Sequence, residues 1–226
     1  MNRILKWILI SIGMIVGGYI IYMIVVVNIL IFTIGGDEFS SKKELINNLN
    51  VKKNEIYLLK KTFNELVPSN YSVYISFNNS KSIDLWVSYL NDTTKNFNTY
   101  LFQQWDINPY NYKPEAPTHI DSTEYAPKTK SLDLVKQKLN WTDNTFKLIE
   151  SYLRSANCIS IKSGNPTTIG FARRGSGGYS FKMFDDPMSD SLKQIYNDGC
   201  IYIVYNDTLV LEWESGVLGV QCFPDK

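Results

Sequence analysis

Residues 158–184 read CISIKSGNPTTIGFARRGSGGYSFKMF, in which three short runs are separated by turn-forming residues. Isoleucine, threonine, tyrosine and phenylalanine in the runs favour β-strands, while the glycine, asparagine and proline between them favour tight turns. Turns this short connect neighbouring strands in antiparallel order. The stretch therefore predicts an antiparallel β-sheet.

The rest of the chain outside the first residues predicts more strands of this kind, mixed with helices. Strands are expected at 71–77, 82–89, 201–205, 209–213 and 217–223. Apolar residues at helical spacing predict helices from Ser41 onward and over 50–67, 92–105, 132–139, 142–153 and 189–197, the last stopped by Gly199. No internal repeat of fixed period is found. The expected class is α+β, with helices and an antiparallel sheet.

The N-terminal segment predicts a membrane anchor at 1–36, followed by a globular domain at 37–226. No charged residue occurs from Trp7 to Gly36, a run of 30. A spanning helix needs about 20 apolar residues, so a single transmembrane helix is expected at about 7–34. A cleaved signal peptide has a shorter apolar core and an Ala-x-Ala cleavage site, and this run has neither feature.

The charges flanking this run predict its orientation in the lipid bilayer. Arg3 and Lys6 lie on the short side, which favours a cytoplasmic N-terminus and an extracytoplasmic domain. Gly13 and Gly17 form a Gly-x-x-x-Gly pair, through which two membrane helices can approach closely and form a dimer. The alternative is that these glycines are ordinary, because glycine is common in membrane helices.

Composition limits the classes of partner and cofactor. The net charge is +1, so the chain lacks the positive field that gathers nucleic acid. His119 is the single histidine and the three cysteines lie far apart, so neither a metal site nor another cofactor is expected. For Cys158, Cys200 and Cys222 we expect burial as free thiols, although the sequence also allows one bridge in an oxidising compartment.

Two segments are candidate contact surfaces for a partner. The first is the proline-rich loop at 107–130 with its flank, which carries four aromatic residues: Trp105, Tyr110, Tyr112 and Tyr125. The second is the glycine-rich turn that follows Arg173 and Arg174, where backbone donors and guanidinium groups allow an anion site. A plain hairpin loop with solvated arginines is the alternative for this turn.

Catalytic constellations are not evident in the sequence. A Ser-His-Asp or Cys-His arrangement would have to recruit His119, and no nucleophile motif accompanies it. Asp185 and Asp186 are interpreted as turn residues. Glu212 and Glu214 fall on one face of a predicted strand, which is typical of a half-solvated strand.

The leading hypothesis is a membrane-anchored, non-enzymatic extracytoplasmic interaction domain whose partner is another protein. An envelope accessory, a sensor and an immunity-type protein all fit this description. The alternative is a membrane-anchored hydrolase of envelope carbohydrate or peptide that uses a carboxylate pair. A third possibility is a structural membrane component that acts through its helix.

Overall fold

The computed structural model describes residues 17–26, 41–79, 81–90, 100–113, 131–174, 177–214 and 222–224. Residues 17–26 are helical, and the rest of the predicted membrane helix, including Gly13, lies outside these ranges. Within them, no helix combines the length and the hydropathy that a membrane crossing requires. The described residues from 41 onward form an α+β fold, as predicted.

The described strands form one eight-stranded antiparallel sheet with the order β3-β2-β1-β4-β5-β6-β8-β7. The strands are β1 (Tyr71–Asn79), β2 (Ser82–Tyr89), β3 (Tyr100–Ile107), β4 (Ser160–Lys162), β5 (Thr167–Arg174), β6 (Gly177–Met183), β7 (Tyr202–Asn206) and β8 (Leu209–Glu214). The expected antiparallel pairing of 158–184 is thus confirmed.

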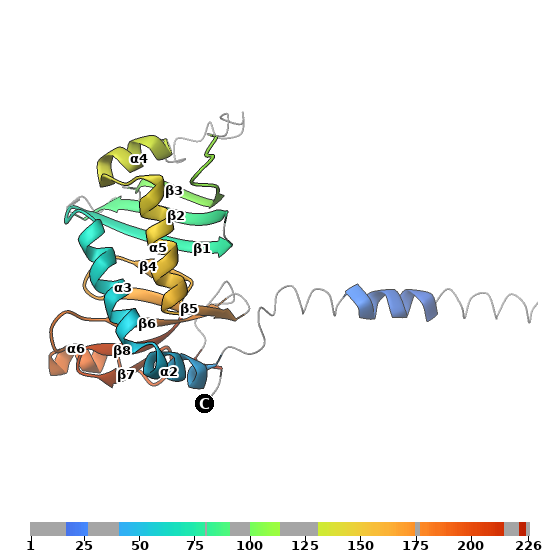
Figure 1. Cartoon of the computed structure of the whole chain (residues 1–226). Coiled ribbons are helices and arrows are strands. Elements are labelled where there is room, and N and C mark those ends of the chain that lie inside the picture. The colour runs from blue at the N-terminus through green and yellow to red at the C-terminus, as the bar shows by residue number, and fades with distance from the viewer. Residues whose placement is uncertain are drawn as a thin grey trace, which may run out of the picture.

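Helices cover one face of the sheet and bury the main core against it. They are α2 (Lys42–Val51), α3 (Lys53–Leu66), α4 (Leu132–Leu139) and α5 (Asp143–Ser155), and the short helix α6 (Asp190–Ile195) lies near β7. Figure 1 shows α3 and α5 running across the strands. Leu59 of α3 and Phe146 of α5 are buried together with Val73, Ile161 and Phe181 from three strands.

The fold contains a repeat of topology that has no constant period in sequence. The order α2-α3-β1-β2-β3 recurs as α4-α5-β4-β5-β6, and the two units join where β1 pairs with β4. Leu132 and Asp143, which begin the second helix pair, each lie 90 residues after their counterparts Lys42 and Lys53. The strands do not keep this spacing, because Gly177 of β6 follows Tyr100 of β3 by only 77.

Several predicted boundaries need correction. The helix expected over 92–105 is wrong for residues 100–105, because pairing with β2 makes them the start of β3, and residues 91–99 lie outside the description. The helix expected over 50–67 begins at Lys53, since Lys52 ends α2 and separates the two helices. Helix α6 ends at Ile195, so Gly199, with φ +67°, lies in the turn before β7 and does not stop the helix.

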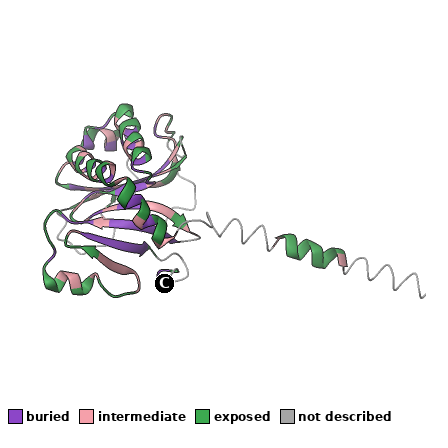
Figure 2. Ribbon diagram, turned by 60° about the horizontal axis from the view of Figure 1, so that its bottom comes forward, coloured by how far each residue is buried: buried purple, intermediate pink, exposed green. Residues whose placement is uncertain are grey.

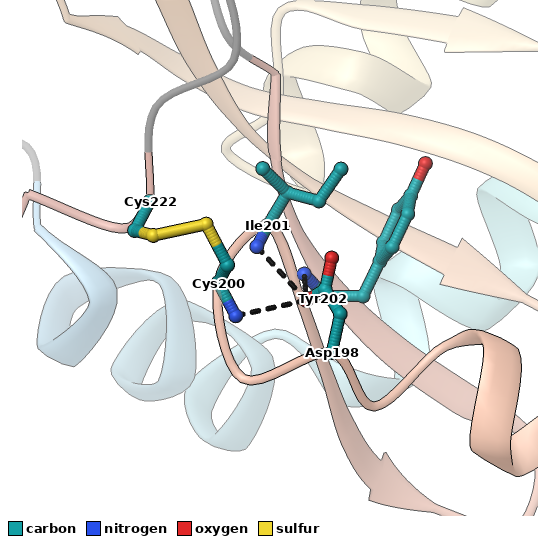
Figure 3. Close-up of a disulfide and its surroundings, with 5 residues drawn as sticks. All are labelled: Asp198, Cys200, Ile201, Tyr202 and Cys222. Carbon is teal, nitrogen blue, oxygen red and sulfur yellow. Dashed lines mark hydrogen bonds between the residues drawn. A yellow bond between two sulfur atoms is a disulfide. The ribbon is translucent and has the colours of Figure 1, made fainter.

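The expectation of three free, buried cysteines is wrong for two of them. Cys200 and Cys222 form a disulfide across 22 residues (Figure 3), whereas Cys158 is free and buried. The backbone amide of Phe223 donates to the Cys200 carbonyl oxygen at 2.9 Å, which brings the two segments together after β7 and β8 have paired. The strand predicted over 217–223 falls largely outside the described residues.

Candidate functional site

The sheet has two chemically different faces. The inner face meets α3 and α5 and is apolar, and in Figure 2 most helices lie on that side of the strands, with exposed residues turned away from it. The outer face carries aromatic and polar residues from the same strands. At its β7–β8 end, a second small core joins Val210 of β8 to Met188 and Leu192 around α6.

Three rings follow one another across the outer face of β1, β2 and β3, and we call them the aromatic shelf: Tyr74, Trp86 and Trp105. The ring centroids of Tyr74 and Trp86 are 4.8 Å apart, and those of Trp86 and Trp105 are 5.9 Å apart, edge to face. Trp105 is 58% exposed, although tryptophan is usually well buried. The shelf is therefore an apolar surface that solvent reaches.

Trp105 lies at a bulge in β3. The pairing of β2 with β3 shifts between Ile83 and Leu85, so that Trp105 and Asp106 together oppose Asp84. Such a bulge re-aims side chains. Asp106 adopts φ +54°, a left-handed conformation that costs a non-glycine residue free energy. The surrounding contacts must offset that cost.

Asp84 supplies those contacts. Its carboxylate accepts hydrogen bonds from the Asp106 amide at 3.0 Å, from Asn78 Nδ2 at 2.8 Å and from Arg173 Nη2 at 3.3 Å. The same guanidinium nitrogen donates to Ser76 Oγ at 3.3 Å. Asp84 thus connects the bulge at Trp105 to an arginine from β5.

The two glutamates of β8 also lie on the outer face, but their surroundings differ. Glu212 is buried, accepts a hydrogen bond from Ser180 Oγ at 2.9 Å and pairs with Lys182 Nζ at 3.0 Å. The interpretation of a half-solvated strand is therefore wrong for Glu212. Glu214 is exposed at the end of β8, yet crowding by protein atoms and then the negative charge of Glu212 raise its pKa.

Among the predicted contact residues, the structure brings Trp105 and Arg173 onto one face. Trp105 packs against Trp86, and Arg173 bonds to Asp84, two residues earlier on the same strand. Their segments are far apart in sequence, so only the pairing of β1, β2, β4 and β5 makes them neighbours.

Tyr110 and Tyr112 lie elsewhere, on the helix-covered side. Tyr112 packs edge to face on Phe102 at 6.1 Å, and Lys147 Nζ of α5 lies 5.8 Å from the Tyr110 ring centre. Burial raises the pKa of Tyr110, and the charges of nearby acidic residues raise it further. Both rings contribute to packing against the core.

The remaining predicted residues are not part of the outer-face group. Arg174 Nη1 donates to the hydroxyl of Tyr179 at 3.3 Å, and Tyr179 belongs to the inner core. Gly17 is in the helix over 17–26, with no atom within 4 Å of where a Cβ would stand. Tyr125 and Gly13 lie outside the described residues.

The residues that sequence analysis missed are Tyr74, Asp84 and Trp86. A signal for two of them was present, because Asp84 and Trp86 alternate on β2 with Ile83, Leu85 and Val87, all three buried. This alternation alone was enough to place Asp84 and Trp86 on the side of the strand opposite the core.

Elsewhere, a hollow of about 260 Å³ lies where the end of α5 meets β1 and β5, lined in part by Phe77, Arg154 and Phe171. In the described ranges, no group of three or more His, Cys, Asp or Glu side chains could hold a metal ion.

Comparisons with family models, with curated proteins and with solved structures find no match for this chain.

Proposed function

We propose that this chain is a membrane-anchored, non-enzymatic binding domain that faces an extracytoplasmic compartment and holds another protein on the outer face of its sheet. Its role would be that of an envelope accessory, a sensor or an immunity-type protein. The uncharged run of 30 residues from Trp7 to Gly36 supports the anchor. The disulfide between Cys200 and Cys222 supports the compartment, because disulfides persist where conditions are oxidising.

The observation that carries the binding role is the aromatic shelf next to Arg173. Tryptophan, tyrosine and arginine dominate the residues whose removal weakens protein interfaces most. Here a half-exposed tryptophan, two further rings and an arginine lie on one face, and Trp105 lies at a bulge whose left-handed residue, Asp106, bonds to Asp84. Strain maintained at a surface favours a functional role for that surface.

A photo-crosslinking amino acid placed at position 105 of the full-length protein, in its own membranes, tests the proposal. We expect a discrete crosslinked protein from position 105. The matched control is position 148, because Leu148 is 41% exposed on α5, on the opposite side of the sheet. Absence of a product at 105, or the same products at both positions, would contradict the proposed surface.

The anchor and its orientation need a separate experiment. We expect the full-length chain to stay in the membrane pellet at alkaline pH. A thiol reagent that does not cross membranes should label Cys222 of intact cells only after reduction of the disulfide. Release into the soluble fraction, or a mature chain lacking residues 1–36, would contradict membrane anchoring.

A dimer formed through the membrane helix is a further element of the proposal. Gly13 and Gly17 are one helical turn apart, so they can form a small-residue contact between two helices. Replacing both by isoleucine should abolish crosslinking between two copies within the membrane, whereas replacing Gly18 alone should not.

The second candidate function is hydrolysis of envelope carbohydrate or peptide by Glu212 and Glu214. The raised pKa of Glu214 beside a second carboxylate favours it, because acid–base pairs need such a difference. Against it, Lys182 and Ser180 engage the carboxylate of Glu212. Turnover of an envelope polymer that Glu214→Gln abolishes, with no crosslink from position 105, would favour this alternative.

A further inference from the structure

Two accessible cations lie on the β4–β5 side of the aromatic shelf, whereas the exposed carboxylate of Asp106 lies at its β3 edge. Lys162 of β4 is exposed and stands directly across from Tyr74 in the pairing of β1 with β4. The side chain of Arg173 is 54% exposed, whereas that of its partner Asp84 is only 10% exposed. The carboxylate of Asp84 is therefore covered, while both cations remain accessible.

The arginine beside the shelf has further hydrogen-bond donors. Arg173 has five N–H donors, of which the contacts to Ser76 and Asp84 engage one nitrogen. A ligand that supplies acceptors therefore complements the accessible donors of Arg173.

These features select among classes of ligand. A nucleic acid would need many more cations than the two beside the shelf, on a chain with net charge +1. A neutral glycan would stack on the rings but would leave Lys162 without a counter-charge. An acidic protein segment with an apolar or aromatic side chain satisfies the rings, the cations and the donors together.

We infer that the partner presents such a segment: an apolar or aromatic side chain that packs on Trp105 and Trp86, flanked by carboxylates that pair with Lys162 and Arg173. This inference rests on the proposed function and specifies the chemistry of its partner. The carboxylates steer the encounter, and the rings retain the bound segment.

Fluorescence anisotropy with the detergent-solubilised full-length chain tests this chemistry. The probe is a labelled 12-residue peptide with a central Phe-Leu pair flanked by aspartates, and the reference peptides replace the aspartates by lysine or by serine. We expect the acidic peptide to bind at least about tenfold more tightly than either reference, and its affinity to fall with added salt.

Variants locate the site. Lys162→Glu should lower the affinity for the acidic peptide about tenfold and raise the affinity for the lysine peptide. Trp105→Ala should lower the affinity for both peptides. The controls are Lys138→Glu, the same charge change at an exposed position on α4, and Leu148→Ala on α5, neither of which should alter binding. Folding of each variant is checked by its thermal unfolding midpoint.

Equal binding of the three peptides, indifference to Lys162→Glu, or displacement of the acidic peptide by a neutral oligosaccharide would overturn the inference. These outcomes differ from failure of the proposed function. A protein crosslinked from position 105 while the acidic peptide does not bind would leave the binding surface in place and refute only the acidic, apolar character of the partner segment.

Discussion

Asp84→Ala removes the acceptor that holds the β3 bulge, and its effect can be worked out from the contacts. The Asp106 amide loses its partner, and an unsatisfied backbone donor that is not fully solvated costs about 1–3 kcal/mol. The pair with Arg173 contributes about 0–1 kcal/mol, because that guanidinium is half exposed. The exposed side chain of Asn78 can hydrogen-bond to water in place of Asp84, so its lost contact adds little. The expected loss of unfolding free energy is therefore about 1–4 kcal/mol.

Urea unfolding of the detergent-solubilised full-length chain, followed by tryptophan fluorescence, measures this loss. For a domain of this size, about 1 kcal/mol corresponds to roughly 2–4 °C in the thermal midpoint, so a fall of about 2–16 °C is expected. The near-ultraviolet circular dichroism should also change, because Trp105 would no longer be held against Trp86 at 5.9 Å.

Two controls separate the bulge contact from the loss of a charge. Asp84→Asn keeps an oxygen for the Asp106 amide and should cost about 1 kcal/mol. Asp186→Ala removes a carboxylate from an exposed position and should stay within about 0.5 kcal/mol of the parent. A loss below about 0.5 kcal/mol for Asp84→Ala, or equal losses for alanine and asparagine, would refute the reasoning about the bulge.

Three further predictions concern stability. Replacing both Cys200 and Cys222 by serine should lower the unfolding free energy by about 3 kcal/mol, measured in urea, because the bridge closes a loop across 22 residues; a loss no larger than the scatter of replicate titrations would contradict this. Burial raises the pKa of the Cys158 thiol from 9.0 to about 12, so the stabilisation by the neutral thiol is complete below pH 9 and is lost as the pH rises toward 12. Relative to Cys158→Ala, the parent should lose about 2 kcal/mol of unfolding free energy at about pH 10.5, and parallel pH profiles of the two proteins would argue against this burial. Gly170→Ala should destabilise by about 1–3 kcal/mol because a Cβ there would overlap Ser160 Oγ, and adding Ser160→Gly should restore most of the loss; no recovery in the thermal midpoint would disprove the overlap.

The starts of α2, α4 and α6 and the hairpins were predictable because they depend on neighbours in sequence. Ser41 caps α2 with its side chain toward the Glu44 amide, and Ser131 and Ser189 cap α4 and α6 in the same way. The hairpin of β1 and β2 follows from alternation and a short polar turn. In contrast, residues 100–105 are a strand because β2 offers them a pairing edge, which no local signal reveals.

The candidate site likewise combines features that were predictable from local sequence with features that depend on strand pairing. That Trp105 and Arg173 could make contacts followed from their residue types, but their meeting on one face needed the order β3-β2-β1-β4-β5. The role of Asp84 depends on the bulge in β3, and a bulge is a mismatch between two strands that neither strand encodes alone.

By itself, the sequence determined the α+β class, the antiparallel connections and the uncharged N-terminal run, because periodicity, turn chemistry and hydropathy act over a few residues. Only the tertiary structure decided which cysteines pair, which tyrosines pack on the core, and that an aromatic shelf lies beside an arginine. The physical reason is distance along the chain: Arg173 meets Asp84 because β5 and β2, remote in sequence, belong to one sheet, and Cys200 meets Cys222 across 22 residues that include the β7–β8 hairpin.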